Sequence, residues 1–299
     1  MKRGMSLRGA LLLGIPAIFA FWAGVARGDG GVNELRTASV NASGASMLVV
    51  NAPAGALTVS GNPDIQKVRV NGKFQGPAGA DLSLFQWNVS RRGASVHVAI
   101  RFPRRALPDS WRPVGKGEIP GEPLYAVDLE IEIPARLGVE VETVYGAVEI
   151  CRVRSVRLQG ELNDIRVEEV EGDVTLSAGA GECVIRKVGG DVFLEKGPGE
   201  VRVERVGGSV EVTRAPRKWT MHPAMEQGDA EYDPAGEIII THVRGSVHVK
   251  EDGRGDIRVH NVAGDFTVDK DPDGDLAYEH IGGRVRVPRT GPPKNSGRN

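Results

Sequence analysis

The densest group of potential metal ligands in the sequence is the segment 269–275, which reads DKDPDGD. Its alternate carboxylates have the spacing with which a calcium loop begins, because several carboxylate oxygens together hold a hard cation. The four weak calcium candidates are Asp269, Asp271, Asp273 and Asp275. The twelfth position is His280, whereas a calcium loop would close there with Glu. Since Asp and Gly also form ordinary turns, an exposed acidic turn is the preferred interpretation.

Histidines form a second group of potential ligands. His242 and His280 occupy the same position in two units of the repeat described below, with Asn261 between them and His260 one residue away. Stacked imidazoles bind transition metals, but the middle member of this column is not a ligand of that kind. Solvated polar residues at a corner are the preferred interpretation, and no metal site is predicted.

Two irregular segments, 103–123 and 216–235, are the predicted binding loops. Both interrupt the strand pattern, and 103–123 is rich in Pro and Gly. Long loops on a rigid scaffold often carry binding residues. The binding-loop candidates are Trp111, Trp219, His222 and Tyr232. The plainer interpretation of 216–235 is a decayed or looped-out repeat unit.

The outward positions of the repeat decide the expectation about catalysis. One outward column is Glu149, Arg166, Val184, Arg202, Ile239, Arg258 and Ala277, and the other is Arg157, Thr175, Phe193, Glu211, His248, Thr267 and Arg286. Neither column gathers the paired carboxylates of a glycosidase. The sequence also shows no Ser/His/Asp order and no Gly-rich phosphate loop. We therefore predict no catalytic residue, no cofactor and a protein that is not an enzyme.

A repeated β phrase would position all of these residues. Its units start at Gly146, Asn163, Gly181, Gly199, Gly236, Gly255 and Gly274. The steps between them are 17, 18, 18, 37, 19 and 19 residues, so the one long step is about two units. A fixed period in this range is the signature of stacked-coil folds. We predict an all-β, single-domain β-solenoid of two-strand coils, each of about 18 residues.

Alternation of period two separates inward from outward side chains within each unit. The inward columns are almost wholly aliphatic. The first is Val148, Ile165, Cys183, Val201, Ile238, Ile257 and Leu276, and the others begin at Ile150, Val153, Val156 and Leu158 and end at Tyr278, Ile281, Val285 and Val287. Cys183 is therefore expected in the core and Cys151 at a corner. This placement disfavours a disulfide, which needs the two residues close together.

The rest of the chain has a simple predicted organisation. Residues 27–45 are expected to be a flexible leader, and 46–290 form the β-repeat domain. Within that domain, the non-repeat strands of 46–135 are expected to pack on the stack or continue it, and the repeats occupy 146–290. Residues 291–299 are expected to be a disordered tail.

The N-terminus predicts export. Three cations precede a 14-residue apolar run, 10–23, and a small-residue site at 24–26 follows it, as in a secretory signal peptide of residues 1–26. The run is shorter than the ~20 residues that span a bilayer, so no stable transmembrane segment is expected after cleavage. Cleavage removes three cations and changes the formal charge from −1 to −4. A mildly acidic chain argues against a nucleic-acid partner.

These phrases resemble the bacterial putative-adhesin family, an exported β-strand-repeat domain of unknown function. The resemblance covers roughly residues 47–288 and is carried by LVVNAPAGALTVSG, VDLEIEIPARLGVEVETVYGAVEI, GDIRVHNVAGDFTV and GGRVRVP. It implies a solenoid-like β fold and an adhesive or envelope-associated role. The family has no agreed catalytic residues, so none is carried over.

The leading hypothesis is an exported, non-enzymatic β-solenoid, a putative adhesin or an envelope structural module whose envelope or surface partner is unknown. The alternative is a periplasmic ligand-binding protein or carbohydrate-active enzyme with its site in the 103–123 and 216–235 loops. A pocket of convergent polar groups beside the loop tryptophans would favour that alternative. The predicted location is the periplasm, the cell surface or the medium.

Overall fold

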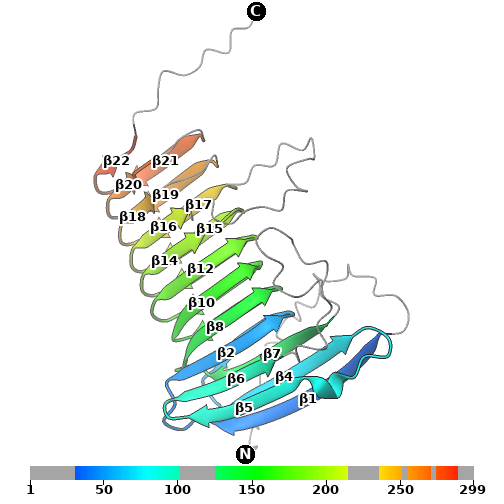
Figure 1. Cartoon of the computed structure of the whole chain (residues 1–299). Coiled ribbons are helices and arrows are strands. Elements are labelled where there is room, and N and C mark those ends of the chain that lie inside the picture. The colour runs from blue at the N-terminus through cyan, green and yellow to red at the C-terminus, as the bar shows by residue number, and fades with distance from the viewer. Residues whose placement is uncertain (1–30, 102–124, 215–235, 251–254, 271–273, 289–299) are drawn as a thin grey trace, which may run out of the picture.

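The computed structural model describes residues 31–101, 125–214, 236–250, 255–270 and 274–288. Within these residues the chain forms 22 strands and one short 3-10 helix, η1 (Leu82–Leu84). The strands lie in rows along one long axis (Figure 1). The prediction of an all-β protein is confirmed. None of the described residues belongs to a helix long and apolar enough to cross a membrane.

The strands form two sheets of 11 strands each. Sheet A contains, in spatial order, β1 (Val32–Asn41), β4 (Lys67–Gly76), β7 (Ala126–Pro134), β3 (Leu57–Asn62), β9 (Val148–Val153), β11 (Ile165–Val170), β13 (Cys183–Val188), β15 (Val201–Val206), β17 (Ile238–Val243), β19 (Ile257–Val262) and β21 (Leu276–Ile281). Sheet B contains, from the same end, β5 (Gln86–Arg92), β6 (Ser95–Arg101), β2 (Met47–Ala54), β8 (Gly138–Tyr145), β10 (Ser155–Leu162), β12 (Val174–Ala180), β14 (Val192–Lys196), β16 (Val210–Arg214), β18 (Val247–Lys250), β20 (Phe266–Val268) and β22 (Val285–Arg286).

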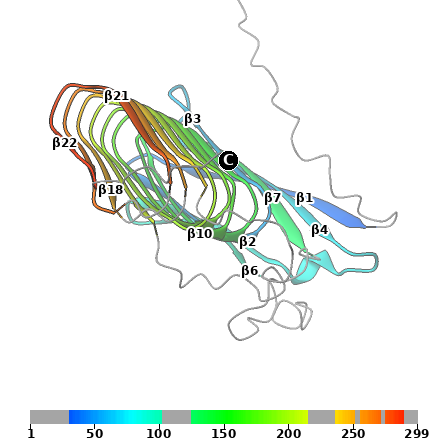
Figure 2. The same cartoon turned by 90° about the horizontal axis from the view of Figure 1, so that it is seen from above.

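Each coil consists of one strand from each sheet, and successive coils pair in parallel. Val148 lies opposite Ile165, and Ile165 lies opposite Cys183, as the repeat period predicts. Seen along the stack, the coils superpose as flattened loops (Figure 2). The β-solenoid is therefore confirmed, with each coil supplying the backbone hydrogen bonds of its neighbours.

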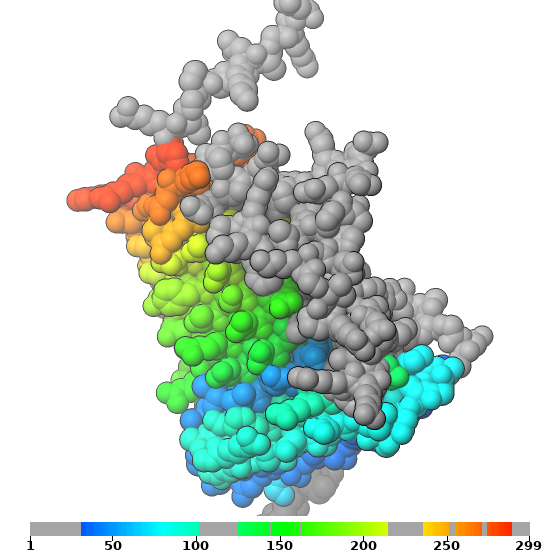
Figure 3. All heavy atoms as spheres, viewed as in Figure 1, coloured from blue at the N-terminus to red at the C-terminus, as the bar shows by residue number. Residues whose placement is uncertain are grey.

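The core is the set of inward columns predicted from the alternation. From β9 to β20 every member of these columns is at most 4% exposed. Most are Val or Ile, whose branched side chains suit a packed, pleated surface, and burying one of them stabilises the fold by roughly 2 kcal/mol. On the face shown in Figure 3 the coils follow one another from blue to red in chain order, apart from the N-terminal coils.

The last coil departs from the predicted columns. Tyr278 and Val285 were expected to face inward with the other members of their columns, but they are 43% and 36% exposed. Leu276 and Ile281 are only partly buried. The reason is that no described strand stacks beyond β21 and β22, so one side of this coil has no neighbour.

The long step in the repeat does not interrupt the stack. Val201 of β15 lies opposite Ile238 of β17, and Val210 of β16 lies opposite Val247 of β18. The coils on either side of 215–235 are thus direct neighbours. This pairing agrees with the looped-out interpretation of 216–235, and the segment itself lies outside the described residues.

The N-terminal strands continue the stack, but not in chain order. β2 and β3 pair in parallel with β8 and β9, so they form the coil directly before the first repeat. β6 and β7 in turn pair in parallel with β2 and β3, so they form the coil before that. The chain therefore forms the coil of β2 and β3 first and the outer coil of β6 and β7 later. It then continues to β8 and β9 on the other side of β2 and β3.

Antiparallel strands close the N-terminal end of the stack (Figure 1). β4 pairs antiparallel with β7, β1 with β4, and β5 with β6. This is a correction to the flexible leader expected at 27–45, because Val32–Asn41 form β1, which pairs with β4 over ten residues. The alternation of partly buried and exposed residues in β1 fits one covered face.

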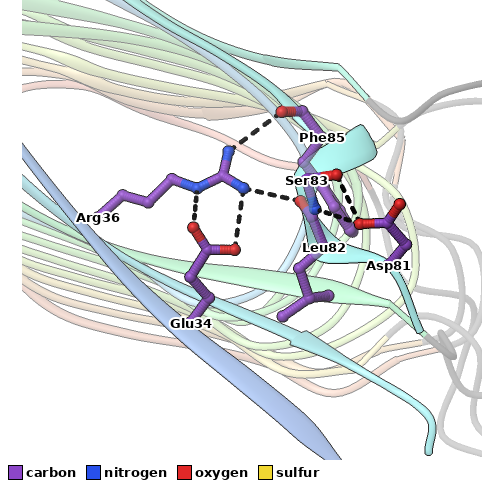
Figure 4. A network of polar contacts seen from close by, with 6 residues as sticks. All are labelled: Glu34, Arg36, Asp81, Leu82, Ser83 and Phe85. Atoms are coloured by element: carbon purple, nitrogen blue, oxygen red, sulfur yellow. Dashed lines mark hydrogen bonds and ion pairs between the residues drawn. The ribbon is translucent and has the colours of Figure 1, made fainter. Parts of the chain in front are cut away.

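Arg36 fastens β1 to the end of the stack. Its guanidinium donates to the carboxylate of Glu34 and to the carbonyl oxygens of Leu82 (2.7 Å) and Phe85 (3.1 Å), as Figure 4 shows. It also lies 4.2 Å from the ring centroid of Phe74. Hydrogen bonds from a charged group are stronger than those between neutral groups, so this contact locks the antiparallel strands together.

Both cysteines are free thiols. Cys183 is fully buried in the first inward column, as predicted, whereas Cys151 is half-buried beside the corner. Burial raises the pKa of Cys183 to about 12. Cys183 is therefore a small core residue and not a reactive thiol.

Candidate binding groove

Each coil turns from sheet A toward sheet B at a residue with a left-handed backbone. The residues at this position have φ between 55° and 60°, and none is glycine: Arg152, Glu169, Lys187, Arg205, His242, Asn261 and His280. We call this column the αL corner. A non-glycine residue in this conformation costs about 1 kcal/mol. Because of this turn, the side chain of the next residue, such as Val153, points into the core. The left-handed residue and the residue before it both face outward, so two non-core residues precede the third inward column.

An open groove of about 1360 Å³ runs along the αL corner. In six consecutive coils its lining comes from three successive positions: the αL residue, the buried aliphatic residue after it, and the residue after that. The third position is small in four coils, at Gly189, Gly207, Ala263 and Gly282. Because these residues have little or no side chain, they leave the space that forms the groove. At about 4.8 Å per coil, the groove is roughly 29 Å long from Arg152 to His280.

Backbone packing keeps two of these positions small. A Cβ atom at Gly189 would lie 2.1 Å from the carbonyl oxygen of Glu171, and one at Gly207 would lie 2.3 Å from that of Gly189. Ala263, by contrast, is exposed and already carries a Cβ atom. The groove is therefore built into the stacking of the coils.

The charged part of the lining is mainly cationic. Its cations are Arg152, Lys187, Arg205 and Arg244, and its anions are Glu169 and Glu171. Lys187 Nζ lies 2.7 Å from Glu169 Oε1, and this hydrogen bond lowers the pKa of the Glu169 carboxyl. One cation of the four is thus paired within the groove, so the surplus of positive charge remains.

A second ladder of charges runs beside the αL corner, one residue earlier in each coil. Arg186 lies between Glu168 (3.6 Å) and Glu204 (3.3 Å) on the neighbouring coils. Such partly exposed ion pairs at the surface contribute little to stability. They orient the side chains next to the groove.

The C-terminal end of the groove carries the histidines. Asn261 Nδ2 and His242 Nε2 are 3.1 Å apart, which confirms that these residues stack in one corner column. The His260 ring lies 4.9 Å from the His280 ring and 6.4 Å from the His242 ring, between centroids. Glu279 lies opposite His260 across β19 and β21. The sequence prediction did not include Glu279, although it occupies the same repeat position as His260.

The acidic segment proposed for calcium is only partly described. His248 Nε2 lies 2.9 Å from Asp269 Oδ1, and the backbone N–H of Asp275 donates to Asp256. Asp271 and Asp273 lie outside the described residues. The calcium candidates therefore stay a prediction.

All four binding-loop candidates, Trp111, Trp219, His222 and Tyr232, also lie outside the described residues. The alternation did place the apolar outward residues correctly: Phe193 is 43% exposed, and Val184 and Ile239 are partly exposed. The N-terminal strands extend the sheets at one end of the stack, so they do not cover these residues.

The opposite corner, between sheet B and sheet A, holds two buried cations that the sequence analysis did not single out. Lys196 is fully buried, and its Nζ donates to the carbonyl oxygens of Gly179 (2.5 Å) and Pro198 (2.6 Å). Arg214 lies opposite Lys196 and donates to the carbonyl oxygen of Gly199 (3.0 Å). Both residues stand at the next inward position of the alternation in their strands. This alternation could have predicted from the sequence that they are buried.

These cations sit beside a column of glycines with left-handed φ. Gly146, Gly181 and Gly199 have φ of 125°, 119° and 114°. A Cβ atom at Gly199 would lie 2.1 Å from the carbonyl oxygen of Gly181, so only glycine fits there. Lys196 and Arg214 satisfy the carbonyl groups that this tight corner turns inward.

Solved structures similar to this chain carry the word adhesin or adhesion in their names. The "putative adhesin" from Parabacteroides distasonis ATCC 8503 is 12% identical, with a TM-score of 0.42, and the match covers 87% of this chain and 98% of that one. The "putative adhesin" from Bacteroides fragilis NCTC 9343 is 11% identical, with a TM-score of 0.38, and the match covers 85% of this chain and 97% of that one. The "putative cell adhesion protein" from Clostridium sporogenes ATCC 15579 is 11% identical, with a TM-score of 0.29, and the match covers 86% of this chain and 99% of that one.

The names of these structures agree with the resemblance stated for the repeat phrases. With TM-scores below 0.5, they carry no argument about what this chain binds. No family model matches the chain. No curated protein sequence matches it either.

Proposed function

We propose that this protein is exported and acts, without catalysing a reaction, as an adhesin-like binding module of the cell envelope or cell surface. The groove is the observation that carries the proposal. It is open, it is continuous over the coils from Arg152 to His280, and its floor is a column of aliphatic residues that are buried in every coil before Ile281. An extended ligand laid along it would meet the same position in coil after coil. A small substrate would instead require polar groups that converge on one point.

The lining favours an extended acidic segment of a partner protein. The groove is lined by four cations and two carboxylates, so its lining carries a net positive charge. Oppositely charged surfaces attract each other and speed association. Among the described residues that line the groove there is no Trp, Tyr or Phe on which a sugar ring would stack. An acidic polypeptide is therefore a better match than a glycan.

Ala263→Trp tests whether the groove binds. Ala263 is exposed and lines the groove, so the indole fills the groove without straining the backbone. We expect at least a tenfold loss of affinity for the envelope-protein fraction of the source organism, measured with the immobilised protein. Ala277→Trp is the matched control, because Ala277 is also exposed but does not line the groove. Equal binding by the two variants would exclude the groove as the binding surface.

The salt dependence of the same binding tests the ligand class. Binding to an acidic segment should weaken as ionic strength rises from low to physiological, because salt screens exposed charges. Salt-independent binding that Ala263→Trp still abolishes would point to an uncharged ligand in the groove.

Proteolysis of intact cells tests the location. Cleavage of the protein on unlysed cells would support an adhesive role at the surface. Complete protection, with release on osmotic shock, would place the protein in the periplasm and rule out adhesion. A protein that is retained in the cytoplasm with its first 26 residues intact would contradict export.

A further inference from the structure

We propose that His260, Glu279 and His280 form a transition-metal site on the flank of the last two coils, with Zn²⁺ as the best-matched ion. One ligand atom from each of the three side chains lies within 4.8 Å of the other two. This cluster is separate from the acidic segment considered for calcium. It also goes beyond the proposed function, because it does not depend on what occupies the groove.

The solenoid itself brings the three residues together. β19 and β21 are neighbouring parallel strands, and their register places His260 directly opposite Glu279. His280 follows Glu279 at the αL corner, where its φ is 55°. The left-handed turn changes the direction of the side chain, and the His280 ring lies 4.9 Å from the His260 ring, at an interplanar angle of 88°. Residues 19 and 20 positions apart in the chain thus converge on one point.

The distances fit a zinc site after small side-chain movements. Zinc ligands lie about 2.0–2.2 Å from the ion, so two ligand atoms of a tetrahedral site are roughly 3.4 Å apart. His260 Nδ1 and Glu279 Oε2 are 3.5 Å apart. The remaining separations are at most 4.8 Å. Rotation of exposed side chains closes a gap of this size without moving the paired backbone.

The donor set selects the class of metal. Two imidazole nitrogens and one carboxylate oxygen suit Zn²⁺ and neighbouring transition metals, whereas Ca²⁺ and Mg²⁺ prefer oxygen ligands alone. Three protein ligands leave a fourth position of a tetrahedral zinc site open. His260 is partly exposed and the other two are exposed, so an ion reaches them directly from solvent.

A metal at this site would join the last coil to the one before it. The end of the stack has no described neighbour beyond β21, and contacts between adjacent coils supply most of the stability of a solenoid. An ion held by His260 on β19 and by two residues of β21 is an additional bond across that interface. Metal binding to the folded state then raises its stability.

Calorimetric titration with ZnCl₂ tests the site, with the full-length protein purified without a histidine tag. We expect one high-affinity Zn²⁺ per chain and no comparable binding of CaCl₂. His260→Asn, His280→Asn and Glu279→Gln should each lower the affinity for Zn²⁺ at least tenfold. Asn is chosen for position 280 because it tolerates the left-handed backbone.

Two control variants and a stability measurement make the result decisive. His242→Asn changes a histidine whose ring lies 6.4 Å from that of His260 but that is outside the proposed ligand set. His97→Asn changes a histidine on β6. Both variants should bind Zn²⁺ within threefold of the wild type. Zn²⁺ should raise the thermal midpoint of the wild type and of both controls, but not that of the three ligand variants. In EDTA all six proteins should unfold at similar temperatures. Absence of Zn²⁺ binding, or equal loss in the control variants, would overturn the proposal.

Discussion

Lys196 is a fully buried cation in a core that is otherwise mainly aliphatic. Its ammonium group is fully buried and is held by backbone carbonyl oxygens, with Arg214 on the next coil. Burial lowers the pKa of Lys196 from 10.5 to about 8. The unfolded chain therefore binds more protons at this residue than the folded chain does between these two pH values, so its contribution to stability increases as pH rises through that interval.

Lys196→Met should remove this pH dependence. From pH 7.5 to pH 9, the free energy of unfolding of the wild type should rise by about 1 kcal/mol relative to that of the variant, since one pKa unit corresponds to about 1.4 kcal/mol. Urea unfolding at the two pH values measures the difference. Cys183, whose pKa is raised, acts in the opposite direction as pH rises, but it is present in both proteins, so its contribution cancels in the comparison.

Lys187→Met is the matched control for that prediction. Lys187 is an exposed lysine paired with Glu169 in the groove. Its removal should leave the pH dependence between 7.5 and 9 unchanged. If Lys196→Met and the wild type show the same dependence, the Lys196 ammonium is not destabilised by burial.

Among the elements, β15 and β17 provide the clearest test of how the stack tolerates insertions. They pair in register although 31 residues separate Val206 from Ile238. In the preceding coil, only Gly197 and Pro198 separate Lys196 from Gly199 at the same corner. Strand pairing, together with contacts such as Lys250 Nζ with Glu211 Oε1 (2.6 Å), thus joins these two coils directly.

Replacement of residues 215–235 by Gly-Pro should therefore preserve the fold. Shortening a loop of 21 residues to two reduces the entropy cost of closing it, so the free energy of unfolding should stay the same or rise by up to about 2 kcal/mol. Urea unfolding measures this value. A loss of stability greater than about 2 kcal/mol would show that the segment packs against the coils. The same variant tests the loop candidates Trp219, His222 and Tyr232, because a binding activity located there would disappear while the fold remains.

The two ends of the whole molecule differ. At the N-terminal end, β1 covers the edge of β4 with ten antiparallel residue pairs, and Arg36 fastens it. At the C-terminal end, Tyr278 and Val285 are exposed and no described strand covers β21. Uncovered strand edges are templates for pairing with another chain. β1 thus replaces β4 as the edge strand of sheet A, so the backbone of β4 is not available for pairing with another chain.

Removal of β1 should make the protein self-associate. A variant that starts at Ala42 exposes the edge of β4, and we expect dimers or larger assemblies in light scattering coupled to size-exclusion chromatography. A variant that starts at Val32 keeps β1 and is the control. If both variants have the same mass as the processed protein, the edge of β4 is protected by something other than β1.

The candidate site was only partly predictable. The repeat placed His242, Asn261 and His280 in one corner column, and their stacking confirms it. The groove was not predicted, because the sequence analysis did not recognise that the small residues that leave its space, such as Gly189 and Gly207, lie in one row beside the left-handed turn. Glu279 was missed because the sequence analysis considered only the histidines near this corner and not the carboxylate that occupies the repeat position of His260 in the next coil.

The sequence by itself determined the solenoid, the register of its coils and the composition of its core. These features follow from period two within strands and from a unit of about 18 residues between them, and both are local patterns. Only the tertiary structure decided the order of the N-terminal coils, the closing of their end by β1, and the groove along the αL corner. The first two depend on pairing between strands far apart in the chain, such as β7 with β3 and β1 with β4, and the groove depends on the stacking of successive corners. The repeat period predicts that the units stack, but which side chains come into contact at the corners depends on the backbone conformation there.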